Sequence, residues 1–140
     1  NLGQMIRTAY ASGATAVILS KRDWSQSEVT LMKSSAGCYD RMQIIKLNNL
    51  EEDMKALKEK GYHIAITHRE ESSIDFIDYD YPFPLLLAFG GELRGLSRSV
   101  IQARDVSLKI NYPTQTKVAL NAVSACAIVC FEVYRKRKAV

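Results

Sequence analysis

The sequence predicts an α/β fold with three layers and a mostly parallel sheet. Short runs of β-branched and other apolar residues alternate with segments of helical periodicity along all 140 residues. Apolar residues make up 47% of the chain and charged residues 24%, which is the balance of a folded globular protein. The length fits one domain with its own core, and no repeat or low-complexity tract interrupts the alternation.

The first third of the chain predicts helix, strand, helix and strand in that order. Residues 2–13 place apolar side chains at helical spacing and end on a glycine. Residues 14–20, ATAVILS, are small or β-branched for the most part, which favours a buried strand. In residues 27–34 the first serine can cap a helix and the glutamate after it lies in the first turn. The segment KSSAG ends this helix, and residues 42–47, MQIIKL, predict a second short strand.

The middle of the chain carries the clearest helix signal. Residues 49–61, NLEEDMKALKEKG, begin with an asparagine cap, place acidic residues early and lysines late, and end on a glycine. Residues 62–67, YHIAIT, predict a third strand. Residues 68–84 are acidic, polar and interrupted by proline, so we expect a loop or a covering segment there.

The last third predicts two more strands and two helices. Residues 85–89, LLLAF, are apolar throughout and favour a buried strand. Residues 97–104 predict a short helix and residues 105–110, DVSLKI, the last strand. After the polar loop NYPTQT we expect a long helix over residues 117–138.

This last helix is apolar around most of its circumference. A helix of that kind is buried on more than one side. In a small domain one side can pack on the sheet, and a second subunit is the natural cover for the other. We therefore expect a homodimer that forms through the C-terminal helix.

Charge and cysteine content narrow the class of protein. The formal net charge of +4 permits a nucleic acid partner without requiring one. Three cysteines without zinc-site spacing predict no metal and fit a reducing, cytoplasmic location. The longest apolar stretch, residues 118–133, contains Asn121, Ser124 and Glu132 and is shorter than the roughly 20 residues of a membrane span.

The glycine-rich segment LLLAFGGELRGLS, residues 85–97, is the first candidate site. Ligands of open α/β sheets bind beyond the carboxyl ends of the strands, where this segment lies. Its glycine spacing differs from the known phosphate-binding loops, and the carboxylate of Glu92 would repel a phosphate. The segment therefore suits a ligand that is cationic or rich in hydrogen-bond donors, although a tight turn with a solvated glutamate explains the same residues.

Two further segments carry polar residues of ordinary appearance. At the start of the chain, NLGQMIRTA places Asn1 before a helix and Arg7 within it. Near the end, Asn121 lies in the first turn of the last predicted helix. Taken singly, Arg7 would be a surface ion-pair partner and Asn121 a helix cap.

Together and in this order, the segments resemble the SpoU family of RNA ribose 2′-O-methyltransferases, within the SPOUT superfamily. NLGQMIRTAYASGA is similar to the first motif, N-x-G-x-x-x-R-T-A followed by a strand, and KSSAG to the K-x-S-A-G segment. LLLAFGGELRGLS is similar to the second motif, a strand that runs into G-x-E-x-x-G-L. INYP, then ALN, then a helix with a basic end resemble the third motif. The resemblance covers essentially the whole chain.

The resemblance implies a trefoil knot in the C-terminal part of the sheet, with S-adenosylmethionine bound in the knot and the active site between two subunits. It places the cofactor on a set of five residues, mainly through their main chain. These are Thr67, Gly90, Gly95, Ile110 and Leu120.

The resemblance also implies a catalytic set of Asn1, Arg7, Glu92 and Asn121. A guanidinium stays protonated in proteins, so we expect Arg7 to stabilise the developing alkoxide or to bind the adjacent phosphate rather than to accept a proton. Glu92 would orient Asn1 and Arg7. No metal is expected.

The chain departs from the family pattern in three places. Ala119 stands where the third motif has serine, Asn111 replaces the proline of I-P-M, and the loop between Ile110 and Leu120 is one residue longer. The family has a strand before the first motif, so we expect residues 1–140 to be a catalytic domain without that first strand and without an N-terminal RNA-binding domain.

The sequence gives only a weak indication of which RNA is the substrate. The segment TLMKSSAG replaces the arginine-rich stretch of the members that act on the tRNA wobble position and is closer to the ribosomal-RNA and tRNA-guanosine branches. Of these substrates we expect ribosomal RNA. The tail RKRK can contact RNA phosphates or be a solvated helix end. The alternatives are a catalytically impaired RNA-binding paralogue, suggested by Ala119, a base-methylating SPOUT enzyme, and an unrelated nucleotide-binding α/β module.

Overall fold

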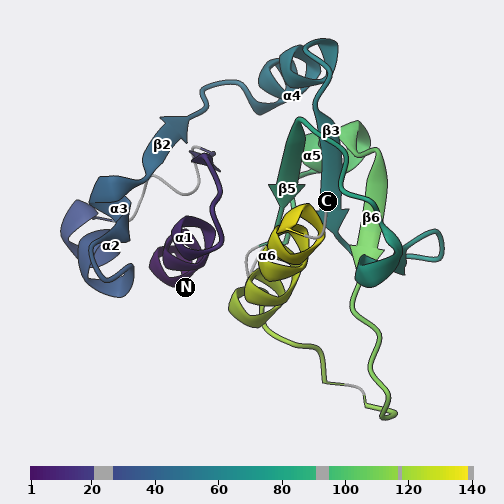
Figure 1. The fold of residues 1–140 in the computed structure, drawn as a ribbon. Helices are drawn as coiled ribbons and strands as arrows, with labels where there is room; N and C mark the ends of the chain where they lie inside the picture. The colour runs from purple at the N-terminus through teal and green to yellow at the C-terminus, as the bar shows by residue number, and fades with distance from the viewer. Residues whose placement is uncertain (21–26, 91–94, 117, 139–140) are drawn as a thin grey trace. The chain divides into compact units, whose positions relative to one another are not determined.

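The computed structural model describes residues 1–20, 27–90, 95–116 and 118–138 (Figure 1). The chain divides into two compact units. One consists of Asn1–Asn49 with Cys126–Val140, and the other of Leu50–Ala125. We describe each unit by itself.

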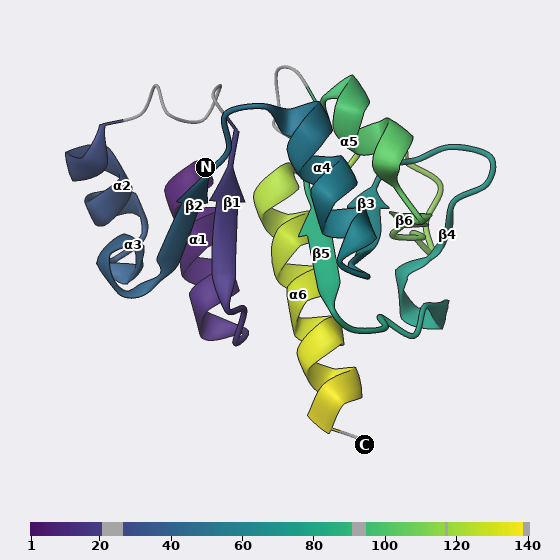
Figure 2. The same cartoon turned by 90° about the horizontal axis from the view of Figure 1, so that it is seen from above.

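The first unit begins with alternating helices and strands, as predicted. In chain order these elements are α1 (Leu2–Ala11), β1 (Ala16–Leu19), α2 (Glu28–Ser34), α3 (Cys38–Arg41) and β2 (Gln43–Lys46). Strands β1 and β2 lie side by side and parallel, with Ala16 opposite Gln43 (Figure 2). Buried Ile6, Leu31 and Met42 form a core between the helices and this strand pair.

Local signals explain where these helices begin. The Ser27 hydroxyl accepts a hydrogen bond from the Thr30 N–H at 3.2 Å, which confirms the predicted cap of α2. Helix α3 was not expected from the sequence. It follows Gly37, whose φ of +83° is a left-handed conformation that only glycine adopts without strain, so the chain turns there and enters one more helical turn.

The second unit is built on a four-stranded parallel sheet. Its elements are α4 (Leu50–Glu59), β3 (His63–Thr67), β4 (Ile74–Asp75), the 3₁₀-helix η2 (Phe76–Asp78), β5 (Leu85–Ala88), α5 (Arg98–Ala103) and β6 (Val106–Lys109). The strand order is β4-β6-β3-β5, and every pair is parallel. Helices α4 and α5 pack on each other, and α5 packs on β3.

Strand β4 and helix η2 correct one expectation. The polar segment 68–84 is expected from the sequence to be a loop or a covering segment without a strand, yet Ile74 pairs with Leu108 at the edge of the sheet. The Asp75 carboxylate caps η2 by accepting from the Ile77 N–H at 3.1 Å. The Tyr81 hydroxyl donates to the Phe76 carbonyl at 2.6 Å. Two residues of pairing are too few to leave a periodic signal in a sequence.

Asp105 joins the start of β6 to its neighbours. One of its carboxylate oxygens accepts from the Ile64 N–H at 2.7 Å, and the other lies 3.2 Å from the Lys58 ammonium. Lys58 also donates to the Ala103 carbonyl at 2.9 Å. One carboxylate therefore sets the register of β6 against β3 and ties the end of α4 to both.

Helix α6 (Ala122–Lys138) begins five residues later than the expected start at 117. The reason lies in the side chains that precede it. The Thr116 hydroxyl accepts from the Val118 N–H at 3.1 Å, and the Tyr112 hydroxyl accepts from the Leu120 N–H at 2.9 Å. These bonds hold residues 118–120 outside the helical conformation until Asn121 caps the first turn.

Candidate functional site

Three strands of the second unit end at the same edge of the sheet, where parallel α/β sheets bind ligands. In the register of the sheet, Ile66 of β3 lies opposite Ala88 of β5, and Thr67 lies opposite Leu108 of β6. The Thr67 hydroxyl donates a long hydrogen bond of 3.4 Å to the Ala88 carbonyl. Thr67 and the chain that continues from β5 and β6 are therefore brought together at one edge.

The glycine turn after β5 closes on itself through bare backbone. A Cβ atom at Gly90 would lie 2.9 Å from the Gly95 carbonyl carbon and 2.9 Å from the Leu96 nitrogen. Gly95 itself has a φ of +62°. Both glycines are thus required by geometry, Gly90 by close approach and Gly95 by its left-handed backbone. Glu92, the predicted acidic residue of this turn, lies outside the described residues.

The loop after β6 is held by contacts of the Arg69, Asn111 and Tyr112 side chains. The Arg69 guanidinium donates to the Ile110 carbonyl at 2.6 Å and lies over the Tyr112 ring, 5.3 Å from its centroid. The Asn111 amide donates to the Asp75 carboxylate at 2.7 Å, which gives the departure from the family's proline a structural role. Tyr112 accepts from the Leu120 N–H, as described above.

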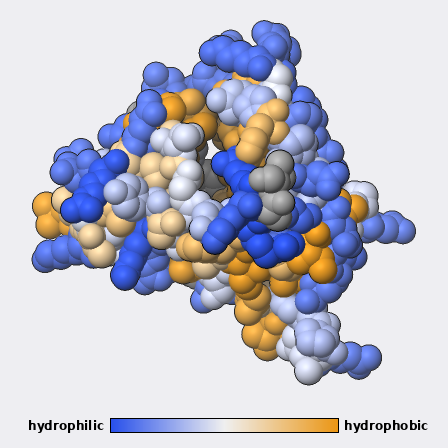
Figure 3. Space-filling view, in the orientation of Figure 1, coloured by the Kyte–Doolittle hydropathy of each residue, from blue (hydrophilic) through white to orange (hydrophobic). Residues whose placement is uncertain are grey.

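This loop projects from the sheet (Figure 1) and lines an open hollow. The hollow has a volume of about 530 Å³ and is lined by Arg69, Asn111, Tyr112, Thr114, Gln115 and Thr116. At the lower edge of the space-filling view the loop presents polar and apolar surface next to each other (Figure 3). Val118 and Leu120 account for exposed apolar area, with 77% and 44% of their surface exposed.

Asn121 has the ordinary role of a helix cap. Its side-chain oxygen accepts from the Ser124 N–H at 2.9 Å, and its carbonyl accepts from the Ala125 N–H at 3.0 Å. The side-chain NH₂ group can still donate to a ligand. Capping and ligand binding are therefore compatible at this position.

Asn1 and Arg7 belong to the first unit. Asn1 stands at the cap position of α1 without a side-chain cap, and its carbonyl accepts from the Met5 N–H at 3.0 Å. Arg7 is exposed on the same helix. Their meeting with Glu92 and Asn121 in a catalytic set stays a prediction.

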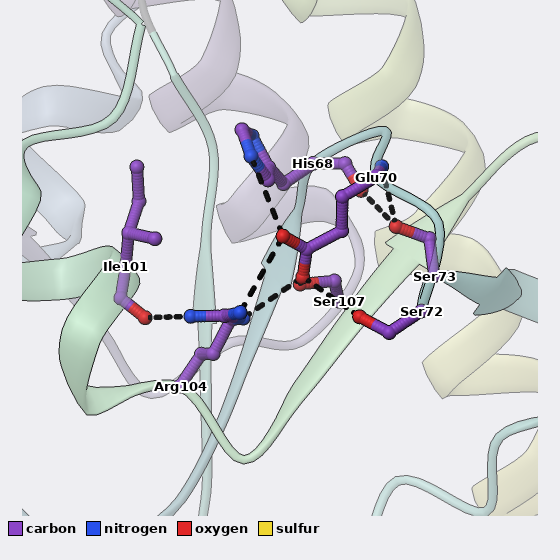
Figure 4. A network of polar contacts seen from close by, with 7 residues as sticks. All are labelled: His68, Glu70, Ser72, Ser73, Ile101, Arg104 and Ser107. Carbon is purple, nitrogen blue, oxygen red and sulfur yellow. Dashed lines mark hydrogen bonds and ion pairs between the residues drawn. The ribbon is translucent and has the colours of Figure 1, made fainter.

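A polar network behind the carboxyl edge was missed by the sequence analysis (Figure 4). Glu70, in the loop after β3, accepts from Ser107 of β6 at 2.6 Å, from Arg104 at 3.0 Å and from Ser72 at 3.1 Å. Arg104 also donates to the Ile101 carbonyl at 2.6 Å. The network ties the β3–β4 loop, which carries Arg69, to α5 and β6. Arg104 and Ser107 lie 34 and 37 residues from Glu70 in the sequence, so no local sequence pattern indicates these contacts.

The Glu70 network makes the stability of the fold depend on pH. The hydrogen bond from Ser107, helped by those from Ser72 and the charge of Arg104, lowers the pKa of Glu70 below its ordinary value of 4.5. The unfolded chain therefore takes up a proton here before the folded chain does, so this stabilisation is present above pH 4.5 and is lost as the pH falls through the lower, folded pKa. We expect the stability difference between wild type and Glu70→Gln to be constant near neutral pH and to shrink in acid.

Urea unfolding at a series of pH values between neutral and strongly acidic measures this difference. Glu71→Gln is the matched control, because Glu71 is the exposed neighbour. Parallel curves for wild type and Glu70→Gln over the whole range would contradict the prediction.

Among the described residues there is no group of three or more His, Cys, Asp or Glu side chains placed to hold a metal ion. None of the described helices is both long enough and apolar enough to span a membrane.

The sheet and its edge define a class of protein. It is an α/β protein with parallel strands whose carboxyl ends carry a glycine turn, closed by backbone contact, and a polar loop, held by side-chain contacts. The model of the SpoU rRNA Methylase family matches residues 1–131. The chain therefore belongs to the SpoU rRNA methylase family, and the resemblance found in its motifs is confirmed.

Its relatives include proteins named as members of the TrmH family of tRNA/rRNA methyltransferases. One, from Staphylococcus saprophyticus, is 37% identical over 138 residues, which cover 98% of this chain and 54% of the relative. YacO of Bacillus subtilis is 34% identical over 141 residues, 100% of this chain and 55% of YacO. The chain thus spans about half the length of the curated relatives it matches.

Solved structures support the fold. An AdoMet-bound rRNA methyltransferase from Sinorhizobium meliloti is 26% identical with a TM-score of 0.80, covering 96% of this chain and 51% of that one. The A. aeolicus TrmH/SpoU tRNA modifying enzyme is 24% identical with a TM-score of 0.83, covering 99% and 69%. These likenesses confirm an α/β fold with parallel sheets. The predicted third layer and trefoil knot stay predictions.

Proposed function

We propose that this chain transfers the methyl group of S-adenosylmethionine to a ribose 2′-hydroxyl of structured RNA, and that the RNA is ribosomal rather than transfer RNA. The observation that carries the proposal is the bare-backbone contact between Gly90 and Gly95 at the carboxyl edge of the sheet. Membership of the SpoU rRNA methylase family supports the RNA-methylating activity.

The described residues fit the cofactor. S-adenosylmethionine supplies a methyl group on a positively charged sulfur. A side chain at Gly90 would meet the backbone of Gly95 and Leu96, so the turn can offer a ligand its peptide groups at this point, and such groups suit a ligand with many donors and acceptors. We assign binding to Thr67, Gly90 and Gly95, together with the main chain of Ile110 and Leu120 at the two ends of the projecting loop.

The catalytic roles are assigned to polar residues of the three motifs. Arg7 stays protonated and would stabilise the alkoxide that forms on the ribose oxygen. Glu92 would orient Asn1 and Arg7, and the side-chain NH₂ of Asn121 would donate to the ribose. Holding the hydroxyl in line with the methyl group can supply part of the roughly 7–11 kcal/mol available from orientation.

A homodimer would complete the site, with the knot holding the cofactor loops. Within the single chain, α6 exposes Ile128, Phe131 and Tyr134 by 36%, 44% and 48%. The Phe131 and Tyr134 rings contact edge to face at 6.2 Å. An exposed aromatic pair on a helix of this kind supports a subunit interface. The basic end of the helix, Arg135 to Lys138, supports contact with RNA phosphates.

Methyl transfer tests the proposal directly. Purified protein is incubated with S-adenosylmethionine carrying a labelled methyl group and with ribosomal RNA or tRNA transcripts. We expect label in ribosomal RNA, recovered after alkaline hydrolysis as uncleaved dinucleotides, because a 2′-O-methyl group blocks the attack of that hydroxyl on its phosphate. Label in a nucleobase would replace the ribose assignment with base methylation. RNA binding without any transfer would favour the catalytically impaired paralogue.

A further inference from the structure

Two side chains form hydrogen bonds with main-chain groups of Ile110 and Leu120, the two loop residues assigned to the cofactor. The Arg69 guanidinium donates to the Ile110 carbonyl at 2.6 Å. Ten residues along the loop, the Leu120 N–H donates to the Tyr112 hydroxyl at 2.9 Å. Arg69 also stacks on the Tyr112 ring, so the two contacts form one connected unit.

The two contacts differ in what they leave available to a ligand. A carbonyl oxygen has two lone pairs, so Ile110 can accept from Arg69 and from a ligand at once. A peptide N–H has a single hydrogen, and at Leu120 this hydrogen is already donated to the Tyr112 hydroxyl. A ligand acceptor that binds this N–H must therefore displace Tyr112.

We propose that the Tyr112 hydroxyl is an internal cap on the Leu120 N–H, held in place by Arg69, which S-adenosylmethionine displaces when it binds. Tyr112 thereby sets the affinity of the site for its cofactor. The inference rests on the proposed function, because it needs Leu120 to be a cofactor contact.

The surroundings of the loop make the exchange feasible. Leu120 is 44% exposed, and the Tyr112–Leu120 bond is open to solvent, so its release needs no opening of a core. Asn111 keeps the base of the loop on β4 through Asp75, which limits the movement to the residues beyond it. An exchange of one hydrogen bond for another changes affinity by a modest factor, about twofold to tenfold.

Tyr112→Phe tests the cap, because it removes the hydroxyl and keeps the ring beneath Arg69. Without cofactor, we expect the Leu120 amide to exchange with solvent faster in Tyr112→Phe than in wild type, as measured by NMR. In calorimetric titration we expect S-adenosylmethionine to bind Tyr112→Phe about twofold to tenfold more tightly than wild type. Tyr62→Phe is the matched control, since Tyr62 precedes β3 at the opposite edge of the same sheet.

Arg69→Met tests the other half of the unit. It keeps a long side chain and removes the cation, so Tyr112 loses its support and the Leu120 amide should be partly deprotected. Unchanged protection in this variant would overturn the role given to Arg69.

The outcomes separate the cap from the proposed function. Equal or weaker cofactor binding by Tyr112→Phe, with normal binding by wild type, would overturn the cap and leave the cofactor site standing. Binding by Tyr112→Phe and not by wild type would support the cap in its strongest form. Absence of binding by both folded proteins would overturn the cofactor site and the cap with it.

Discussion

A Gly90→Val variant is expected to lose S-adenosylmethionine binding by about a hundredfold or more and to remain folded. The added side chain would lie 2.9 Å from backbone atoms of both Gly95 and Leu96, at the tip of β5. Backbone cannot rotate away as a flexible side chain can, so the turn must open by a few tenths of an ångström or more. The opening displaces the peptide groups that we assign to the cofactor, while the strand behind them keeps its pairing with β3.

Calorimetric titration measures the loss, and circular dichroism with urea unfolding reports whether the fold survives. Gly61→Ala is the matched control. Gly61 has a φ of +90° at the end of α4, so alanine there strains the backbone away from the candidate site. We expect Gly61→Ala to lower stability and to leave cofactor affinity unchanged. Full cofactor affinity in a folded Gly90→Val protein would remove the glycine turn from the site.

The strands and helices of this chain were largely predictable because they depend on short-range signals. Helix α2 begins after Ser27, where a hydroxyl accepts the expected N–H, and β3 is a run of apolar residues that the sheet buries. The same signals fail where pairing is short or where side chains compete with the helix. Strand β4 is two residues long, and α6 starts late because Thr116 and Tyr112 hold the peptide groups before it.

The candidate site was predictable in part, for a similar reason. Gly90 and Gly95 can be interpreted from the sequence alone, because glycine permits a close approach of the backbone and adopts a left-handed conformation without strain. The partners of the loop could not be predicted. Arg69 meets Ile110 from 41 residues away, and the topology of the sheet brings them together. One signal was available: Arg69 lies two residues after the end of β3, at the edge where ligands bind.

Arg69 connects the Tyr112 cap to the Glu70 network. Glu70 anchors the loop after β3 to α5 and β6, and Arg69, the residue before it, reaches the loop after β6. The two loops that flank the candidate cofactor site are therefore held by neighbouring residues. A substitution that shifts the position of either loop is therefore expected to shift the other.

Arg7→Ala is expected to lower the rate of methyl transfer about 100- to 1,000-fold, the loss seen when a donor to a developing oxyanion is removed. The cofactor affinity should stay the same, because Arg7 belongs to α1 and the residues assigned to the cofactor belong to the second unit. Single-turnover rates with labelled S-adenosylmethionine and saturating RNA give the first quantity, and calorimetric titration gives the second. Arg41→Ala, an exposed arginine at the end of α3, is the matched control.

The same variant separates the two roles that fit a guanidinium at Arg7. If Arg7 stabilises the alkoxide, Arg7→Ala lowers the rate at saturating RNA, because the lost contact exists only in the transition state. If Arg7 binds a phosphate of the substrate, RNA affinity falls and the saturated rate is kept. Arg7→Lys sharpens the distinction, since an ammonium can still pair with a phosphate as a point charge but lacks the planar fork of arginine. Unchanged rate and RNA affinity in Arg7→Ala would remove Arg7 from the reaction.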